Sequence, residues 1–413
     1  MQSPFTSTFF ANNRSNLRAR LPRDYPVVCI ANGSLQRNAD TTFPFQQESN
    51  FWYLTGLNEP DLILVMDRHT EYLILPKTNS VKNVFDGHID TTKLQNRSGI
   101  AVLYEAENGW DKLLTSLNKE KALYTIPPEQ RFEPQARMYA NPAQRYTIEK
   151  LRRRVPGLTQ HDVSSYLMEL RARKQPPELE ALETAVQITI ATIEEVRTTA
   201  QLTKYKTEYA LEAAITHGFR TRGAAGHAYA PIVASGMNAT TLHYVANSEA
   251  LGLNELVVAD VGAEYEHYAA DITRTLSLSK PSSRQLEILS AVIDIQHRAA
   301  GLLRPGTTLR EYEQAVAKYT GDALHKLGLI TNARDIHAIR RYFPHASSHF
   351  LGLDVHDVGD YNLPLEESMV LTCEPGIYVP EEGIGVRIED DIVITATGNR
   401  NLSANCSYAA YVI

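Results

Sequence analysis

The segment VVADVGAEYEHYAADITRT, residues 257–275, constrains the fold more than any other part of the chain. Two apolar runs flank a polar turn, a pattern that predicts a β-hairpin. With Tyr265 and Glu266 as the central turn residues, Asp260 and Asp271 lie directly opposite each other, with Cβ atoms about 4.5–5.5 Å apart. Two carboxylates at that distance repel each other, and burial raises the cost. A bound cation removes the conflict, so the segment indicates a metal site. The alternative is an exposed hairpin whose acids are solvated.

A second segment, FPHASSHFLGLDVHDVGD, places His345, His349 and His356 within twelve residues among small and apolar neighbours. A single histidine is most often structural, but three in one glycine-containing stretch favour a functional site. Imidazole groups bind metals, donate to a developing oxyanion or transfer protons.

Two further carboxylates lie on apolar strands near the C-terminus. Glu374 ends the run VLTC and precedes Pro-Gly, where a side chain can face a pocket, and Glu389 lies within GVRIEDDIVIT. A carboxylate inside such a strand is costly unless it is paired or metal-bound; Arg387 is the alternative partner. Strand alternation puts Glu389 and Asp391 on the same face, so periodicity does not choose between them. Neighbouring Cys373 has no identifiable histidine partner and is interpreted as a buried strand residue.

Four carboxylates and at least one imidazole therefore come from strand ends and flanking loops. Hard oxygen ligands with one nitrogen suit Mn²⁺ or Mg²⁺, while Zn²⁺, Co²⁺ and Fe²⁺ remain open. Two cations are feasible, because dinuclear hydrolase sites hold metals about 3.5–4 Å apart. The chemistry expected is metal-assisted hydrolysis, in which a water between two cations loses a proton and attacks a polarised carbonyl.

The first 165 or so residues alternate short apolar runs with helical patterns, which indicates an α/β domain built on a sheet. The expected strands there include PVVCIANG, SNFWYLTGL, DLILVMDR, TEYLILP and KALYTIP, and Trp110 is expected in the core. Near residue 171 the pattern changes, and Pro176 and Pro177 suit the start of a long helix. We therefore expect two domains, residues 1–170 and 171–413. In the second, helices are expected near 178–201, 205–222, 284–304 and 309–327.

Composition limits the function classes. The 413 residues are 43% hydrophobic and 22% charged, with a formal net charge of -7, so no general attraction to nucleic acid or to an anionic membrane is expected. No apolar run is long enough to span a bilayer, and the N-terminus lacks the pattern of a secretory signal. Three widely spaced cysteines fit a reducing compartment, so we expect a cytoplasmic protein.

The motifs together resemble a known family. LHYVAN, DVGAEYEHYAADITRT, PHASSHFLGLDVHDVG, VLTCEPGIYVP and GIGVRIEDDIVIT are similar to the motif set of the pita-bread metallopeptidases, in the same order. The stretch ADTTFPFQQESNFWYLTGLNEPD resembles the start of the Xaa-Pro aminopeptidases within that family. The resemblance implies an α/β (α+β) fold, with a creatinase-like N-terminal domain and a pita-bread catalytic domain of two pseudo-twofold halves.

The resemblance also implies roles for individual residues around two divalent metals, most often manganese. The implied metal ligands are Asp260, Asp271, His349, Glu374 and Glu389, with Asp271 and Glu389 bridging. Glu374 is also implied to take a proton from the attacking water. The implied substrate-contacting and supporting residues are His243, His345, His356, Tyr378 and Arg387.

The leading hypothesis is an aminopeptidase that removes an N-terminal residue when proline is second, with peptides of that kind as partners. The tertiary X–Pro amide lacks an N–H, so general peptidases position it poorly. The alternatives are an Xaa-Pro dipeptidase with the same chemistry, or a metal-free creatinase-like relative or binding module. By resemblance a homodimer or homotetramer is expected. The rings of Phe51, Trp52 and Tyr53 serve either that interface or an ordinary core.

Overall fold

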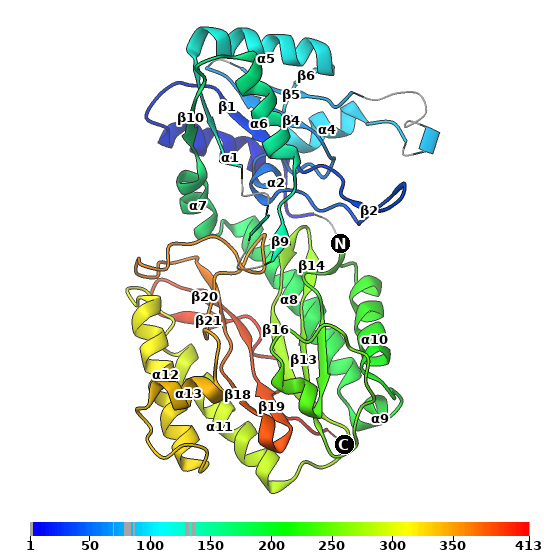
Figure 1. Cartoon of the computed structure of the whole chain (residues 1–413), viewed down its shortest axis with the longest axis vertical. Coiled ribbons are helices and arrows are strands. Elements are labelled where there is room, and N and C mark those ends of the chain that lie inside the picture. Colours follow the sequence, from blue (N-terminus) through cyan, green and yellow to red (C-terminus); the bar gives the residue numbers. More distant parts are fainter. Residues whose placement is uncertain are drawn as a thin grey trace. The chain divides into compact units, whose positions relative to one another are not determined.

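The computed structural model describes residues 3–68, 70–77, 84–85, 87–128, 132–133 and 137–412. The chain forms two compact units, one of Phe5–Leu170 and one of Arg171–Ile413 together with Met1–Pro4. Both mix helices and strands, as expected for an α/β chain (Figure 1). No helix in the described part combines the length and apolar character that a membrane span needs.

The N-terminal unit is built on a six-stranded sheet with the order β10-β7-β1-β4-β5-β6. Strand β4 runs antiparallel to both of its neighbours, and the other pairings are parallel. The strands are β1 (Val27–Ile30), β4 (Ile63–Met66), β5 (Glu71–Ile74), β6 (Val102–Tyr104), β7 (Ala122–Thr125) and β10 (Thr159–Asp162). Two short hairpins lie outside this sheet: β2 (Gln36–Asn38) with β3 (Thr41–Thr42), and β8 (Phe132–Glu133) with β9 (Met138–Tyr139).

Helices α5 and α6 cover one face of this sheet, and their apolar residues pack on alternate strand residues such as Val28, Ile63 and Ile74. Helices α1, α2 and α4 pack on one another, and α2 also contacts β1. The helices are α1 (Ser7–Arg20), α2 (Ser49–Thr55), α4 (Thr91–Ser98), α5 (Ala106–Glu120), α6 (Ala143–Arg154) and α7 (Ser164–Ala172).

The prediction that SNFWYLTGL is a strand is wrong, because Ser49–Thr55 forms helix α2. The Glu48 carboxylate accepts hydrogen bonds from the backbone N–H groups of Asn50 and Phe51 and so caps the helix. Gly56, at φ 68°, ends it in the left-handed conformation. A continuously apolar run does not distinguish a buried strand from a short buried helix. Its aromatic rings are core, since Phe51, Trp52 and Tyr53 are at most 1% exposed.

The C-terminal unit has two halves, each with strands backed by helices (Figure 1). In the first, α8 packs against β14 and β15, and α10 packs against β11 and β12; in the second, α11 and α12 pack against each other and α11 contacts β17–β19. The helices are α8 (Pro176–Val196), α9 (Thr199–Leu202), α10 (Glu208–Thr221), α11 (Ser283–Ala300), α12 (Leu309–Lys326) and α13 (Ile336–Tyr342), with 3-10 turns η1 (Gly236–Thr240) and η2 (Pro380–Glu382). The strands are β11 (Gly226–His227), β12 (Ile232–Ser235), β13 (Leu256–Val261), β14 (Ala263–Tyr265), β15 (Tyr268–Ala269), β16 (Ile272–Ser277), β17 (Val370–Cys373), β18 (Gly376–Val379), β19 (Ile384–Arg387), β20 (Asp390–Ile394) and β21 (Asn399–Asn401).

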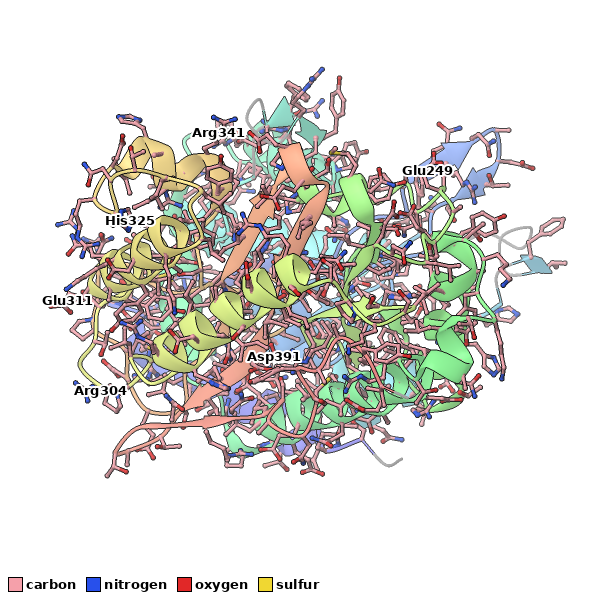
Figure 2. The ribbon with its side chains drawn as sticks, turned by 90° about the horizontal axis from the view of Figure 1, so that it is seen from below. Glu249, Arg304, Glu311, His325, Arg341 and Asp391 are labelled. Carbon is pink, nitrogen blue, oxygen red and sulfur yellow. The ribbon has the colours of Figure 1, made fainter. Side chains whose placement is uncertain are left out.

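The helix predictions in this unit are confirmed within a few residues, and α8 begins at Pro176 as expected. Strands β13, β16 and β19 contact one another and join the two halves. Polar residues of α12 such as Glu311 and His325 lie at the outer surface, whereas Asp391 lies inside among the strands (Figure 2).

The predicted hairpin register is wrong by two residues. Asp260 pairs with Thr273, and Tyr265 pairs with Tyr268, so the central turn residues are Glu266 and His267. Both have positive φ, 48° and 67°, as the tight turns that match strand twist require. A shift of two residues keeps every side chain on its face, so Asp271 stays on the face of Asp260 as a diagonal neighbour.

Candidate metal centre and active-site cavity

Asp260 and Asp271 converge on one phenol. Asp260 lies near the end of β13, and Asp271 directly precedes β16. The Tyr229 hydroxyl lies 2.6 Å from Oδ1 of each. Because the phenol carries one proton, it donates to one carboxylate at a time. Two short contacts to buried acids therefore require a further proton or a cation.

Close backbone approach makes this arrangement possible. A Cβ on Gly262 would lie 1.7 Å from the carbonyl oxygen of Ala270 on the facing strand. Only glycine fits there, so the hairpin can cross over tightly just before Asp271.

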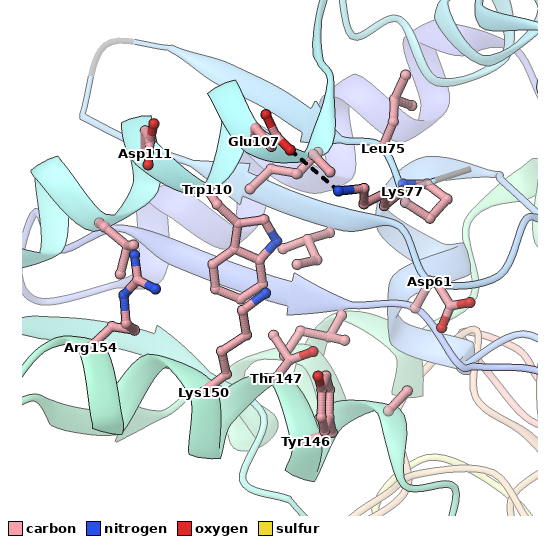
Figure 3. A pocket seen from close by; sticks show the side chains of 18 residues that line it. Asp61, Leu75, Lys77, Glu107, Trp110, Asp111, Tyr146, Thr147, Lys150 and Arg154 are labelled. Carbon is pink, nitrogen blue, oxygen red and sulfur yellow. Dashed lines mark hydrogen bonds and ion pairs between the residues drawn. The ribbon is translucent and has the colours of Figure 1, made fainter. Parts of the chain in front are cut away.

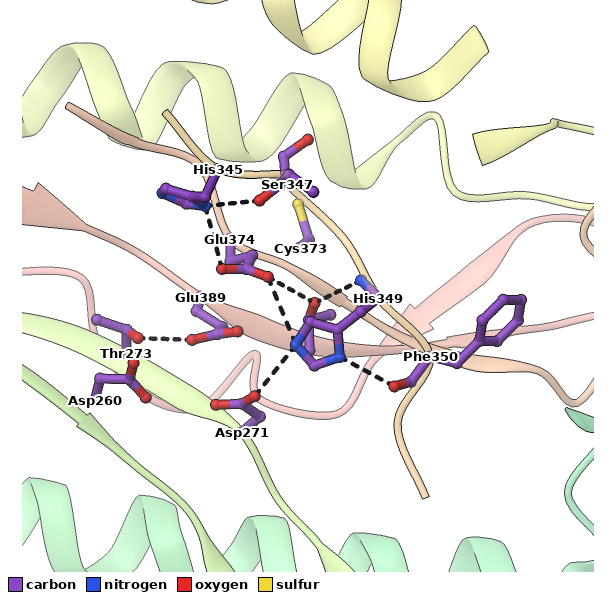
Figure 4. Close-up of polar contacts among 12 residues, drawn as sticks. Asp260, Asp271, Thr273, His345, Ser347, His349, Phe350, Cys373, Glu374 and Glu389 are labelled. Atoms are coloured by element: carbon purple, nitrogen blue, oxygen red, sulfur yellow. Dashed lines mark hydrogen bonds and ion pairs between the residues drawn. The ribbon is translucent and has the colours of Figure 1, made fainter. Parts of the chain in front are cut away.

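His349 and Glu374 face the same point from the other half of the unit. His349 Nε2 lies 3.4 Å from Asp271 Oδ2 and 3.6 Å from Glu374 Oε1 (Figure 4). Its Nδ1 lies 3.0 Å from the Phe350 carbonyl oxygen, which can only accept, so Nδ1 carries the proton and Nε2 is directed at the carboxylates. Glu374 directly follows strand β17, as expected from the sequence.

Glu389 lies between β19 and β20 and is 2% exposed. Its Oε2 accepts a hydrogen bond from the Thr273 hydroxyl at 2.6 Å. Asp391, the alternative that periodicity left open, lies behind the site, where its Oδ2 accepts from the Asp271 backbone N–H at 3.1 Å. Of the two, Glu389 is the carboxylate on the cavity.

Arg387 connects this cluster to the histidines. Its guanidinium donates to Asp260 Oδ2 at 2.5 Å, to the Tyr378 hydroxyl at 2.9 Å and to the Thr273 hydroxyl at 3.1 Å. The Tyr378 oxygen lies 2.9 Å from His345 Nε2, and His345 Nδ1 lies 2.6 Å from the Ala346 carbonyl oxygen. This geometry fixes a neutral His345 that carries its proton on Nδ1.

Most of these side chains line one cavity of about 520 Å³, whereas Thr273, Tyr378 and Asp391 lie behind it. His243 and His356 are exposed on its wall, and the His356 ring lies 4.5 Å from that of His349. Apolar residues complete the wall: Ile232, Leu242, Val245 and Val355. The cavity size is within the usual range for a small-molecule or short-peptide site.

Burial dominates the electrostatics of the cluster. It raises the pKa of Glu374 to about 8, and it raises the pKa values of Glu389 and Asp260, with neighbouring carboxylates adding to the effect. Burial alone would lower the pKa of His349, but its hydrogen bond to Asp271 and the charges of Asp271 and Glu374 raise it to about 9. Burial lowers the pKa of His345 to about 3, with the Arg387 charge in the same direction. The acids thus tend to hold protons that a cation would replace.

The donor set fits a divalent metal. Donor atoms of Asp271, His349 and Glu389 all lie within 4.8 Å of one another. Asp260 and Glu374 border this group on opposite sides, through Tyr229 and His349 respectively. Buried carboxylates with one imidazole are the ligands that hard or borderline dications accept.

All ten residues singled out in the sequence lie in or directly behind the cavity; nine line it, and Tyr378 lies behind through His345 and Arg387. Sequence reasoning missed Tyr229 and Thr273. The only sequence signal for Thr273 is its alternation with Asp271 along the strand. The segment around Tyr229 carries no such signal, because Tyr229 reaches the acids only through the tertiary structure.

Comparison with known proteins defines the class. The model of metallopeptidase family M24 matches residues 180–396, and that of the aminopeptidase P N-terminal domain matches residues 10–124. The chain therefore belongs to metallopeptidase family M24, and the fold expected from the motifs is confirmed.

Individual relatives cover nearly the whole chain. It is 34% identical to the Xaa-Pro aminopeptidase of Escherichia coli, over 96% of this chain and 94% of that protein. A putative aminopeptidase P from Bacillus anthracis superposes with a TM-score of 0.89 at 30% identity, covering 98% of this chain and 97% of that one. The E. coli aminopeptidase P with the inhibitor Pro-Leu superposes with a TM-score of 0.85 at 32% identity, with the same coverage.

Proposed function

We propose that this protein is an Xaa-Pro aminopeptidase, which hydrolyses the bond between an N-terminal residue and a penultimate proline. The observation that carries the proposal is the convergence on one cavity of four carboxylates and one imidazole that can bind metal. Membership of family M24 and the names of the full-length relatives support it. The E. coli relative binds Pro-Leu as an inhibitor, which supports a proline-accepting pocket.

Asp260, Asp271, His349, Glu374 and Glu389 would hold two divalent ions, with Mn²⁺ favoured by the oxygen-rich donor set and Zn²⁺, Co²⁺ or Fe²⁺ as alternatives. Bound dications supply Lewis-acid polarisation of the scissile carbonyl and a nucleophile at neutral pH.

The chain's own residues orient the substrate and move protons. Glu374 Oε2, 3.5 Å from His345 Nδ1, faces the cavity and is the proposed proton acceptor for the attacking water. His243 and His356 project from the wall, where N–H groups can donate to the oxyanion that develops at the carbonyl. Arg387 holds Asp260, and it fixes His345 through Tyr378. Arg387 and Tyr378 are therefore positioning residues.

The test is hydrolysis of Xaa-Pro-Xaa tripeptides by Mn²⁺-loaded protein, beside peptides with alanine in place of proline. We expect release of the first residue from the proline peptides only. Asp271→Asn should abolish it and lower metal content, whereas Asp294→Asn on the exposed surface of α11 should change neither. Absence of cleavage in fully metal-loaded protein would refute the proposal.

Substrate length distinguishes the aminopeptidase from the dipeptidase alternative. An aminopeptidase cleaves a pentapeptide and a dipeptide with the same first two residues, whereas a dipeptidase cleaves only the dipeptide. The metal-free alternative predicts no stoichiometric metal and no inhibition by a chelator.

Two further expectations belong to this proposal. All three cysteines are buried and free, which supports a reducing, cytoplasmic compartment. A homodimer or homotetramer is proposed, but Phe51, Trp52 and Tyr53 are core residues and cannot form its interface. Light scattering at several concentrations measures the assembly directly.

A further inference from the structure

A second cavity lies entirely within the N-terminal unit and far from the candidate metal ligands in the sequence. Its volume is about 640 Å³, and it opens between α5 and α6 (Figure 3). It lies at the carboxyl ends of the parallel strands β1 and β5, where Ile30, Ala31, Ile74 and Leu75 line it.

The topology of the sheet places the cavity next to a reversal of strand order. From β1 the chain proceeds through β4 and β5 to β6, and then returns through α5 to β7 on the other side of β1. Strand order therefore reverses beside β1. In open α/β sheets, ligands bind in the crevice at such a reversal; this cavity lies next to that crevice, on the β4 side of β1.

The cavity has an apolar floor and an aromatic wall. Ile30, Ile63 and Ile74 form the floor, and Leu114 extends it along α5. Trp110, expected in the core from the sequence, packs against the core of the unit but is only half-buried, and it also lines the cavity. An apolar body of moderate size can pack on this surface.

Three hydrogen-bond donors reach the cavity without a partner among the described residues. Thr147 is only 8% exposed, and its hydroxyl forms no hydrogen bond within the described chain. The Trp110 indole N–H likewise has no acceptor there and points into the cavity (Figure 3). Lys150 Nζ lies 3.6 Å from the Trp110 ring centroid and forms no ion pair with a described residue.

The charges around the donors favour an anion. Partial burial lowers the pKa of Lys150, and the neighbouring charge of Arg154 lowers it further, so an anion beside them would relieve the repulsion. Of the acids on the lining, Glu107 is paired with Lys77 at 3.3 Å, while Asp61 and Asp111 lie elsewhere on the lining (Figure 3).

We propose that this cavity binds a small carboxylate with an aromatic or branched apolar body. The carboxylate accepts from Lys150, the Thr147 hydroxyl and the Trp110 indole, and the apolar body packs on the isoleucine floor. No step of the proposed peptidase activity uses this site.

The test compares three probes of nearly equal shape by titration calorimetry: phenylacetate, phenylacetamide and phenethylamine. We expect phenylacetate to bind with one-to-one stoichiometry and about tenfold more tightly than the amide, because the charge-assisted hydrogen bond is lost with the charge. Binding should also change the fluorescence of Trp110, since the other tryptophan, Trp52, is buried among phenylalanine rings.

Variants locate the binding. Thr147→Val and Lys150→Met should each weaken phenylacetate about five- to tenfold. Lys112→Met is the matched control, because Lys112 on α5 also lies over aromatic rings, those of Tyr72 and Tyr104, but does not line the cavity. Phenylacetate should bind Asp271→Asn unchanged, so the result is independent of the peptidase proposal.

Four outcomes would overturn the inference: equal binding of acid and amide, tighter binding of the amine, unchanged affinity in both cavity variants, or loss of binding in Asp271→Asn. Loss of binding in Asp271→Asn would place phenylacetate at the metal centre and not in this cavity.

Discussion

The Asp357 carboxylate provides the sharpest prediction about what holds the loop that carries His349 and His356. Its side chain is 1% exposed, and it accepts hydrogen bonds from Arg171 Nη2 at 2.5 Å and Lys174 Nζ at 2.8 Å. Both cations are equally buried. Asp357 directly follows His356, so this ion cluster anchors one end of the loop that also carries His349.

Asp357→Asn removes the charge at nearly constant volume. Burial alone would raise the pKa of Asp357, but the charges of Lys174 and Arg171 hold it below its usual value, so the carboxylate is ionised in the folded protein. The variant removes the charge that faces both buried cations, while the partly exposed Asp354 stays beside Arg171. Breaking a buried pair in this way costs about 3–5 kcal/mol of unfolding free energy.

The assay must follow the catalytic unit alone, because a two-unit chain need not unfold in one step. Hydrogen exchange read by mass spectrometry on peptides from residues 171–412 serves this purpose under increasing urea. Both tryptophans, Trp52 and Trp110, lie in the N-terminal unit, so their fluorescence transition is an internal control. It should not move.

Asp354→Asn is the matched control. Its side chain also pairs with Arg171, at 2.8 Å, but is 45% exposed, so its loss should cost less than about 1 kcal/mol. If Asp357→Asn costs no more than this control, or if the tryptophan transition shifts equally, the buried cluster is not what secures the loop.

Three further outcomes are expected. Gly262→Ala should destabilise the catalytic unit by ~3 kcal/mol or more and lower metal affinity, since its Cβ would meet the Ala270 backbone; Gly398→Ala, with open space around it, should be nearly neutral in the same urea titration. Burial raises the pKa of Glu178 to about 7. The contribution of Glu178 to the free energy of unfolding is therefore present at low pH and is lost as the pH rises from about 4.5 to 7. Wild type should therefore lose about 3 kcal/mol relative to Glu178→Gln across that window, and parallel stability curves would contradict this. Mn²⁺ binding at pH 7 should release protons, because Glu374 has a pKa of about 8 before a cation binds; calorimetric enthalpies that do not vary with the buffer's ionisation enthalpy would exclude it.

Local chemistry was sufficient to predict much of the fold. Helix α8 begins at Pro176 because proline suits the first turn, and β17 ends at Cys373, just before Glu374 and the Pro-Gly that interrupts the apolar run. These signals act over a few residues, so they are readable without tertiary structure. The strand predicted for Ser49–Thr55 is wrong because all apolar residues of this run are buried, and periodicity then does not distinguish a strand from a helix.

The site was partly readable for the same reason. An acid inside or at the end of an apolar strand is costly wherever the strand lies, so the sequence identifies the pair Asp260 and Asp271, then Glu374, and then either Glu389 or Asp391. The two-residue error in register did no harm, because alternation kept Asp271 on the correct face.

Only the tertiary structure decided which of these groups meet. Tyr229 contacts two acids from a segment with no motif of its own, and Arg387 reaches across to Asp260 on the other half of the unit. The cavity is lined by Glu389 and not by Asp391 because the strand is interrupted between β19 and β20, and strand alternation does not predict this interruption. Sequence determines which side chains cannot be buried alone; distances between segments more than a hundred residues apart are set by packing, and packing determines what each of them is buried with.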